Sequence, residues 1–361
     1  MWPSPGSPVF GSFVARQVEG LRAAGARVTV VANTDRRRGA VRAALKYASL
    51  ARRTRAAVRS GEFDVVVGHY LYPTASFALD AATRAAVPLV LVSHGTDARS
   101  VMRSDRFGAR GREALRRADL VVAVSDALRD TLRAEAGVPP EVPIEVVNMG
   151  FNDDLFVPDP RAREALKLDD PAERIVLFAG NLEHVKGVEV LFEAFVELID
   201  AGRADRLVLV GDGPLAQTVR ERVAALAADD AHADPTGRVT LTGELEQRDV
   251  ARWMAAADVF VLPSRAEGLG LVLLEAMACG TPCVASRVGG IPEVLSDSCG
   301  RLVPAEEPHA LAAAIAAVLA SGKDTFRDAC IERASGHTSE AKAREFLAHV
   351  ERVVGRDGPE D

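Results

Sequence analysis

The chain has 361 residues, of which 48% are hydrophobic and 26% are charged, and its formal net charge is −7. This length is more than one hydrophobic core usually supports, so it indicates two domains. No apolar run approaches the roughly 20 residues that a membrane span needs. The N-terminal residues "MWPSPGSPVFGSFV" lack the basic and then apolar pattern of a signal peptide. We therefore expect a cytoplasmic protein.

Short β-branched runs alternate with helical patterns along the whole chain. In the first half the expected strands cover residues 27–31, 64–69, 88–94, 119–125 and 144–149. In the second half they cover residues 174–180, 206–213, 238–243, 258–264 and 281–286. This alternation predicts an α/β protein with two doubly wound, Rossmann-like domains that face each other across a cleft, where the carboxyl ends of the strands bind ligands.

Residues 151–173 are polar, marked by prolines and rich in acids, which is typical of an interdomain linker. We therefore expect an N-terminal domain over residues 1–155 and a C-terminal domain over residues 156–338. Residues 339–354 keep an apolar stripe at helix period. This stripe predicts that the C-terminal segment 339–361 contains a helix that packs against the rest of the chain, and we expect it to pack back towards the N-terminal domain.

The cysteines and histidines suggest no metal site. The four cysteines lie in the last quarter of the chain, with no histidine at zinc spacing, so we expect reduced core thiols rather than a disulfide or a zinc ligand set. No "H-E-x-x-H" or comparable ligand set occurs among the seven histidines. We expect no metal centre built by protein side chains.

Lys186 follows the predicted strand that ends in "FAG" and, with Gly187, opens a helix. A lysine beside the unpaired N–H groups of a helix N-terminus suits a phosphate. The alternative is a surface lysine near a helix start.

The segment "SRAEGLGLVLLEAMACGTP" (264–282) has glutamates on both sides of a glycine-flanked turn, Glu267 and Glu275. Gly268 and Gly270 let the backbone approach a ligand closely, and the helix start presents unpaired amides from Leu271, Val272 and Leu273. The carboxylate of Glu275 is suited to accept two neighbouring hydroxyls. A glycosidase acid and base would have no use for a phosphate cradle between them, so this spacing suits a sugar nucleotide better than a polysaccharide.

The segment "RLVLVGDGPLAQTV" leaves a second interpretation open. Gly211, Gly213 and Ala216 satisfy the spacing of the dinucleotide fingerprint, between a predicted strand and a helix. This is the second strand unit of its domain, whereas the fingerprint belongs to the first. A nicotinamide-dependent oxidoreductase therefore stands as an alternative.

Together these motifs resemble the retaining glycosyltransferases of family 4 (glycosyl transferases group 1), which have the two-domain GT-B fold. The C-terminal half contributes "GNLEHVKG", "LVLVGDGPL", "VTLTGEL", "ADVFVLPSRAEGLGLVLLEAMACGTPCVASRVGGIPEVL" and "GRLVPAEEPHALAAAI". The N-terminal half contributes "PSPGSPVFGSFVARQVEGLRAAGARVTVV", "LVSHGTD" and "VVNMGFNDDLFVP". The resemblance covers nearly the whole chain, and the order of the motifs makes it specific.

The resemblance implies metal-independent transfer of a hexosyl group, with retention, from a nucleoside diphosphate sugar such as a UDP-sugar or GDP-mannose. It implies no cofactor, and a role in cell-surface polysaccharide or glycolipid synthesis. It also implies that residues 1–155 form the acceptor-side domain and residues 156–338 the nucleotide-sugar-binding domain. Catalytic roles fall on Glu267, Lys186 and His94. Donor binding is implied for Gly11, Asn181, Lys186, Gly268, Leu269, Gly270, Leu271, Val272 and Glu275. Further candidates are Asp97 beside the sugar and Leu241 near the base. A module that binds nucleotide sugars without turnover is the third interpretation.

The sequence departs from the family pattern in two places. Asn181 stands where the family usually has an arginine, which removes one cation from the leaving group. The chain also begins at "MWPSP", where the family has already passed its first, central strand. We expect either an upstream start or a poorly formed N-terminal domain.

Charge is distributed unevenly between the halves. Residues 1–155 hold 22 basic and 16 acidic residues, whereas the rest hold 22 and 35. Residues 36–60 contain nine basic residues and no acid, with a helical stripe made of Arg38, Arg42 and Lys46, and residues 99–117 add seven arginines. This pattern fits either a solvated helix face or reversible adsorption to an anionic membrane, close to a lipid-linked acceptor. A negative net charge and 5% aromatic residues disfavour nucleic acid.

Overall fold

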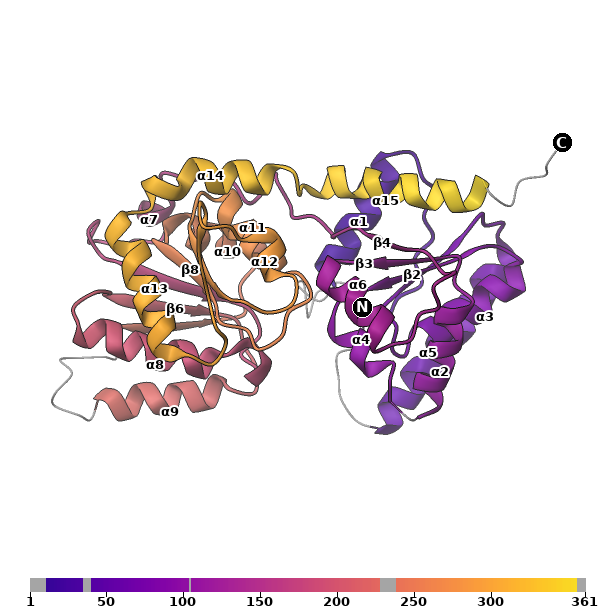
Figure 1. The fold of residues 1–361 in the computed structure, drawn as a ribbon, viewed down its shortest axis with the longest axis horizontal. Helices are drawn as coiled ribbons and strands as arrows, with labels where there is room; N and C mark the ends of the chain where they lie inside the picture. Colours follow the sequence, from indigo (N-terminus) through magenta and orange to yellow (C-terminus); the bar gives the residue numbers. More distant parts are fainter. Residues whose placement is uncertain (1–10, 35–39, 104, 228–237, 356–361) are drawn as a thin grey trace. The chain divides into compact units, whose positions relative to one another are not determined.

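A computed structural model describes residues 11–34, 40–103, 105–227 and 238–355 (Figure 1). The chain divides into two compact units, and the first combines residues from both ends, Met1–Gly150 and Ser339–Asp361. The second unit is Phe151–Thr338. The first holds a parallel sheet of four strands and the second a parallel sheet of six. In the described part of the chain, no helix is both long and apolar enough to cross a bilayer.

The sheet of the second unit has the order β10-β9-β8-β5-β6-β7. Its strands are β5 (Ile175–Ala179), β6 (Arg206–Val210), β7 (Val239–Gly243), β8 (Val259–Leu262), β9 (Cys283–Ser286) and β10 (Gly300–Val303). Every residue of β5, β8 and β9 is buried, which explains their continuous apolar sequences. The chain winds from β5 towards β7 and then returns to β8 on the other side of β5. The loops after β5 and β8 therefore diverge at a topological switch point, where such sheets bind ligands.

Helices pack in two groups in the second unit (Figure 1). One group pairs α8 (Val188–Asp200) with α13 (Pro308–Ser321), and in the other α11 (Leu271–Ala278) contacts α10 (Gln247–Ala256) and α14 (Asp324–Ser335). The remaining elements are α7 (Ala162–Ala165), η1 (His184–Lys186), α9 (Ala216–Ala227) and α12 (Ile291–Val294). The core between them is filled by large apolar side chains, among them the fully buried Phe178, Phe195 and Phe260.

Residues 151–173, which the sequence presents as a linker, pack against the second unit. Phe151 and Phe156 are buried, and α7 contacts α10. The amide of Phe151 donates to the carbonyl of His337 at 3.0 Å, and Phe151 pairs with Thr338 in a parallel bridge. The two passages of the chain between the units therefore lie side by side where they leave the second unit.

The sheet of the first unit has the order β1-β2-β3-β4. Its strands are β1 (Val66–His69), β2 (Leu89–Ser93), β3 (Leu120–Ala123) and β4 (Ile144–Val146). Its helices are α1 (Ser12–Ala23), α2 (Ala40–Ser60), α3 (Ala75–Ala85), α4 (Thr96–Ser100), α5 (Arg106–Arg116), α6 (Asp126–Ala134) and α15 (Ser339–Val354). Helix α15 packs along α1 and buries an apolar stripe made of Ala343, Phe346, Val350 and Val353.

The strand expected at residues 27–31 is not formed. This segment has no strand pairing in the described part of the chain. Two nearby carbonyl groups accept from arginine side chains instead, Val28 from Arg22 at 2.8 Å and Ala32 from Arg53 at 3.0 Å. A strand exists only through its hydrogen-bonded neighbours, so the β-branched pattern alone predicted it wrongly. Conversely, β10 was absent from the expected strands.

Candidate active site

The loops after β5 and β8 are locked together at the switch point of the second sheet. Gly187 has a φ of 66°, and a Cβ at this position would overlap the carbonyl oxygen of Pro263. The amide of Arg265 donates to the carbonyl of Val185 at 2.8 Å. Glycine at position 187 therefore permits both the turn and the close approach that bring the two loops into contact.

This contact brings together two of the residues expected to act on the donor. The ammonium of Lys186 donates to Oε2 of Glu267 at 2.6 Å, although 81 residues separate them in the chain. The hydroxyl of Ser264 donates to the same oxygen at 3.2 Å. Both charged side chains are only partly exposed, 26% for Lys186 and 16% for Glu267. The site thus holds a preset cation whose partner is a carboxylate.

The first turn of α11 offers free backbone donors. Gly270 precedes the helix with a φ of 87°, a conformation that favours glycine. The amide of Leu273 donates to the carbonyl of Gly270 at 2.8 Å, while those of Leu271 and Val272 meet no acceptor within the ranges that the structure covers. Two N–H groups at the positive end of a helix suit an anion. The loop after β9 closes on this turn, because a Cβ on Gly289 would overlap the carbonyl oxygen of Glu267.

Glu275 lies on the second turn of α11 and has an unusual environment. Burial raises the pKa of its carboxyl to about 8. Its side chain makes no hydrogen bond to any described residue. A half-buried carboxyl group that makes no hydrogen bond to a described residue is typical of a ligand-binding residue.

The other expected donor-binding residues of this unit lie in or after strands β5, β7 and β8 of the second sheet. Asn181 is exposed in the loop after β5, Gly268 is half-buried, and Leu269 is buried, so that only its main chain is available. Leu241 lies half-buried in β7, opposite Leu209 of β6.

The glycines of the dinucleotide-like segment have structural partners. A Cβ on Gly211 would overlap the carbonyl oxygen of Gly180, and a Cβ on Gly213 would overlap the backbone of Leu182. These glycines therefore allow the loops after β5 and β6 to pack together. Their pattern is explained without a dinucleotide.

In the first unit, His94 and Asp97 follow β2. Asp97 is buried and its carboxylate accepts from the amides of Leu71 at 2.8 Å and His94 at 2.9 Å, and from the hydroxyl of Ser93 at 3.2 Å. Burial raises the pKa of Asp97, against the effect of these hydrogen bonds. Asp97 therefore joins the loop after β1 to the loop after β2. Whether it also contacts the sugar stays a prediction.

Two residues near His94 were missed from the sequence. Nδ1 of His69 lies 3.2 Å from Nε2 of His94, and the ring of Tyr70 lies 4.5 Å from the ring of His94. The signal was present, because His69 and His94 each come at the carboxyl end of a predicted strand, and neighbouring parallel strands end at one edge. Gly11, expected to approach the phosphates, precedes α1 in this unit with a φ of 76°.

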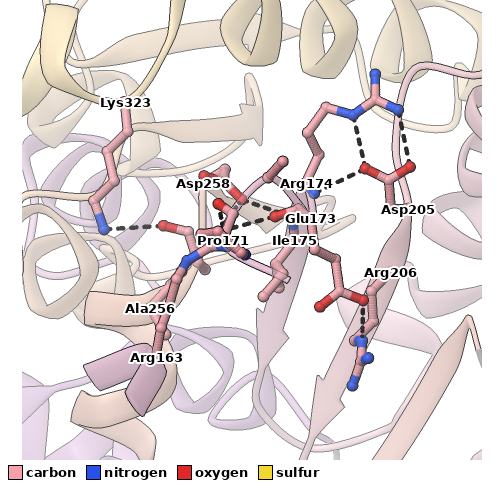
Figure 2. Close-up of polar contacts among 12 residues, drawn as sticks. Arg163, Pro171, Glu173, Arg174, Ile175, Asp205, Arg206, Ala256, Asp258 and Lys323 are labelled. Carbon is pink, nitrogen blue, oxygen red and sulfur yellow. Dashed lines mark hydrogen bonds and ion pairs between the residues drawn. The ribbon is translucent and has the colours of Figure 1, made fainter. Parts of the chain in front are cut away.

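Figure 2 shows polar contacts at the opposite edge of the second sheet. Asp258, just before β8, accepts from the guanidinium of Arg163 and from the amide of Ile175, both at 2.7 Å. Arg174, just before β5, makes a two-pronged ion pair with Asp205 at 2.8 and 2.9 Å. These residues precede their strands, whereas Lys186 and Glu267 follow theirs. The contacts in Figure 2 therefore support the sheet rather than the site.

Among the described residues, no group of three or more His, Cys, Asp or Glu side chains is arranged to hold a metal ion. The four cysteines are buried free thiols.

Two family models match the chain. The Glycosyltransferase Family 4 model matches residues 11–155, and the Glycosyl transferases group 1 model matches residues 173–321. Together they cover the sheets of both units.

Curated relatives match at moderate identity. A D-inositol 3-phosphate glycosyltransferase from Mycobacterium sp. (strain KMS) is 36% identical over 220 residues, which make up 58% of this chain and 47% of the relative. An N-acetyl-alpha-D-glucosaminyl L-malate synthase from Bacillus anthracis is 34% identical over 244 residues, 64% of this chain and 58% of the relative. The chain thus spans about half the length of these relatives. For a D-inositol 3-phosphate glycosyltransferase from Xylanimonas cellulosilytica the identity is 37% over 297 residues, 76% of this chain and 68% of the relative.

Solved structures share the fold. Sucrose-phosphate synthase from Thermosynechococcus elongatus superposes with a TM-score of 0.78 at 23% identity, covering 97% of this chain and 95% of that one. HepE from Anabaena, in complex with UDP-glucose, gives 0.70 at 22% identity, covering 92% and 87%. The two parallel α/β sheets thus form a GT-B fold. With the family models and the Xylanimonas relative, these findings show that the chain belongs to glycosyltransferase family 4.

Proposed function

We propose that this protein is a retaining glycosyltransferase that moves a hexosyl group from a nucleoside diphosphate sugar to an acceptor hydroxyl. The observation that carries the proposal is the cluster at one edge of the second sheet. There Lys186 and Glu267 form an ion pair of 2.6 Å, close to the free amides that open α11 and to the helix that bears Glu275. An anion cradle and carboxyl groups in one place suit a ligand with a diphosphate at one end and hydroxyls at the other.

Lys186 acts on the leaving group. A departing diphosphate gathers negative charge, and a cation and helix amides that are already in place stabilise it without rearrangement. When donor binds, the ammonium of Lys186 exchanges the carboxylate of Glu267 for phosphate oxygens, and Glu267 becomes available to the hydroxyls of the sugar. Asn181 donates hydrogen bonds where the family usually has an arginine. The leaving phosphate assists in taking the acceptor's proton.

Glu275 holds the ribose hydroxyls, and His94 of the first unit contacts the transferred sugar. A uridine nucleotide is the favoured donor, because the HepE structure that shares this fold was solved with UDP-glucose. GDP-mannose is the other candidate. Two curated relatives carry D-inositol 3-phosphate and L-malate in their names, and both molecules bear hydroxyl groups of the kind that this chemistry needs in an acceptor.

The direct test is a screen of the purified protein against common uridine and guanosine diphosphate sugars, for binding, hydrolysis and transfer. One donor should turn over, EDTA should leave transfer unchanged, and NMR should find the donor's anomeric configuration in the product.

Lys186→Ala should lower kcat roughly 100-fold, and by more than it raises KM. Arg203→Ala, which removes an exposed cation of the same unit, is the control.

Other outcomes separate the alternatives. Binding of donor without turnover would identify a nucleotide-sugar-binding module. Binding of a nicotinamide nucleotide with an absorbance change would identify an oxidoreductase. An inverted anomer, loss of transfer in EDTA, or unchanged turnover in Lys186→Ala would each contradict the proposed mechanism.

A second proposal concerns the acceptor, which we place on a membrane. Along α2, one stripe at helix period is exposed and mixes apolar with basic residues, namely Leu45, Ala48, Arg52, Ala56 and Arg59. The side chain of Leu45 is 68% exposed, so the stripe presents an apolar group beside its arginines. Of the stripe expected from the sequence, Arg38 and the side chain of Arg42 lie outside the described residues, and Lys46 is half-buried against Tyr47. Such a surface suits peripheral adsorption to an anionic bilayer on the cytoplasmic side and a lipid-linked acceptor.

A further inference from the structure

Two histidines meet at the edge of the first sheet. His69 ends β1 and pairs in register with Val92 of β2, and His94 follows two residues later. Nδ1 of His69 lies 3.2 Å from Nε2 of His94. The rings are nearly parallel, with an interplanar angle of 14° and centroids 5.4 Å apart. The distance between the nitrogens is that of a hydrogen bond between two rings.

Neighbouring residues hold the ring of His94 in place. The ring of Tyr70 lies 4.5 Å away and that of Phe13 lies 5.1 Å away. Tyr70 has a φ of 67°, a conformation that bulky residues rarely adopt, while its amide still donates to Val92 at 2.9 Å. The backbone of His94 is fixed by Asp97 at 2.9 Å. His94 nevertheless keeps part of its surface exposed, so a ligand can reach it.

The contact between the rings couples their protons. A neutral imidazole carries one N–H, on either nitrogen. Burial lowers the pKa of His94 to about 3, and burial together with the nearby His94 lowers the pKa of His69. Both rings are therefore neutral near pH 7, and only one of the two facing nitrogens carries a proton. If that proton is on His69, then His94 must carry its own proton on Nδ1.

We propose that His69 is a positioning residue for His94: their hydrogen bond fixes the ring and its tautomer, so that His94 presents Nδ1–H as a donor to the transferred sugar. The inference rests on the proposed function, in which His94 contacts that sugar. Among the described residues, the titratable groups that face the pair are Tyr70, which follows β1, and Asp97 of α4. The Asp97 carboxylate is directed at backbone amides and Ser93, so in the described structure the imidazole of His94 is hydrogen-bonded by His69.

Three substitutions of His69 separate the hydrogen bond from the packing. His69→Phe keeps a ring and loses the hydrogen bond, and should lower kcat about 10-fold with little change in KM for the donor. His69→Asn places an amide near the position of Nδ1 and should restore most of the turnover. His69→Asp puts a carboxylate beside His94, which should raise the pKa of His94. An acid limb should then appear in the pH profile of kcat, because His94 becomes protonated as the pH falls. His309→Phe, on the exposed part of α13, is the control.

The tautomer itself can be read without any substrate. In protein labelled with ¹⁵N-histidine, two-bond ¹H–¹⁵N correlations report which nitrogen carries the proton, with His94 assigned by loss of its signals in His94→Gln. We expect one Nδ1–H tautomer in the native protein and in His69→Asn, and a mixture in His69→Phe. A native Nε2–H tautomer, or unchanged kcat and tautomer in His69→Phe, would overturn the proposal. If His69→Phe does not fold, the absence of a raised His94 pKa in His69→Asp would do so.

These two readouts also separate this inference from the proposed function. If the native protein turns over no donor, the proposed function fails, while the spectra still decide whether His69 sets the tautomer. If transfer occurs but the tautomer is independent of His69, only the role of His69 fails.

Discussion

The carboxyl of Glu275 is half-buried on the second turn of α11. Burial raises its pKa to about 8, so the free protein holds it largely protonated at neutral pH. The sequence predicted a carboxylate on the second turn of a helix, near a diphosphate site. It could not predict the raised pKa, because burial depends on how the whole chain folds.

Glu275→Gln should change the pH dependence of stability. The pKa in the folded state lies above the ordinary value of 4.5, so the folded state binds more protons than the unfolded state between those two values. The contribution of Glu275 to stability is therefore present below about pH 4.5 and is lost as the pH rises through about 8. Glutamine carries no charge, so the melting temperature of the variant should exceed that of the native protein increasingly from pH 5 to pH 8.5.

Calorimetry across this pH range measures the difference. Glu332→Gln, at an exposed position of α14, is the matched control and should follow the native curve. Parallel curves for Glu275→Gln and the native protein would contradict the raised pKa.

The contacts between the site residues were not predicted from the sequence. Lys186 and Glu267 were each expected at the donor, yet their ion pair joins loops that are 81 residues apart. The proximity of Lys186 and Glu267 cannot be read from the sequence, because it depends on the packing of Gly187 against Pro263. His69 is the opposite case. It carried a readable signal at the end of a strand, and the missing step was to place β1 next to β2.

At the scale of elements, apolar runs predicted most strands because parallel strands covered on both faces must be apolar throughout. Nine of the ten expected strands are present, with their ends shifted by a few residues. The segment 27–31 is also β-branched, yet it has no strand pairing in the described chain and none of its residues is buried. The pattern alone therefore establishes neither burial nor pairing. β10, with the sequence "GRLV", is too short and too polar at Arg301 to be recognised alone.

Arg163 should support the second sheet far more than Arg174 does, although Figure 2 shows both in ion pairs. Besides Asp258, Arg163 donates to the carbonyls of Ala256, Pro171 and Glu173 at 3.0, 3.1 and 3.0 Å. Arg163→Met would remove the guanidinium from these three carbonyl groups and leave the carboxylate of Asp258 with the amide of Ile175 but no cation from Arg163, at a cost of about 2–4 kcal/mol. Arg174→Met removes a more exposed pair, and should cost no more than about 1 kcal/mol.

Denaturant unfolding of the two variants gives the comparison. Both should retain donor affinity at low temperature, because these residues precede their strands whereas the site follows them. Equal destabilisation by the two substitutions, or a loss of donor affinity in folded Arg163→Met, would contradict this division between the two edges of the sheet.

At the scale of the whole molecule, alternating strands and helices predicted two parallel α/β sheets, and two are present. Strand order could not be read from the sequence, because a β-α unit does not state on which side of the previous strand the next one lies. The C-terminal helix belongs to the first unit, whereas its apolar stripe predicts only that the helix packs and not which unit it packs on. Charge, by contrast, is additive along a chain, so the basic character of residues 1–155 follows directly from counting their side chains.

This charge distribution leads to the prediction about membrane attachment. If the exposed stripe of α2 adsorbs to anionic lipid, each basic residue near the surface contributes on the order of 1 kcal/mol. The double variant Arg52→Glu/Arg59→Glu should then bind vesicles of phosphatidylcholine and phosphatidylglycerol at least about 10-fold more weakly than the native protein. Leu45→Ser should weaken binding by less, through lost apolar contact.

Co-sedimentation with vesicles measures these effects. Native binding should require phosphatidylglycerol and weaken as salt is raised, because screening limits exposed charges to about 8 Å at physiological ionic strength. The control is Arg203→Glu/Arg220→Glu, which makes the same charge change at exposed positions of the second unit and should bind as the native protein does. Equal binding to vesicles with and without phosphatidylglycerol, or equal losses in the two double variants, would reduce the stripe to a solvated helix face. The acceptor would then be sought among soluble metabolites, since the lipid-linked acceptor is proposed on the strength of this stripe.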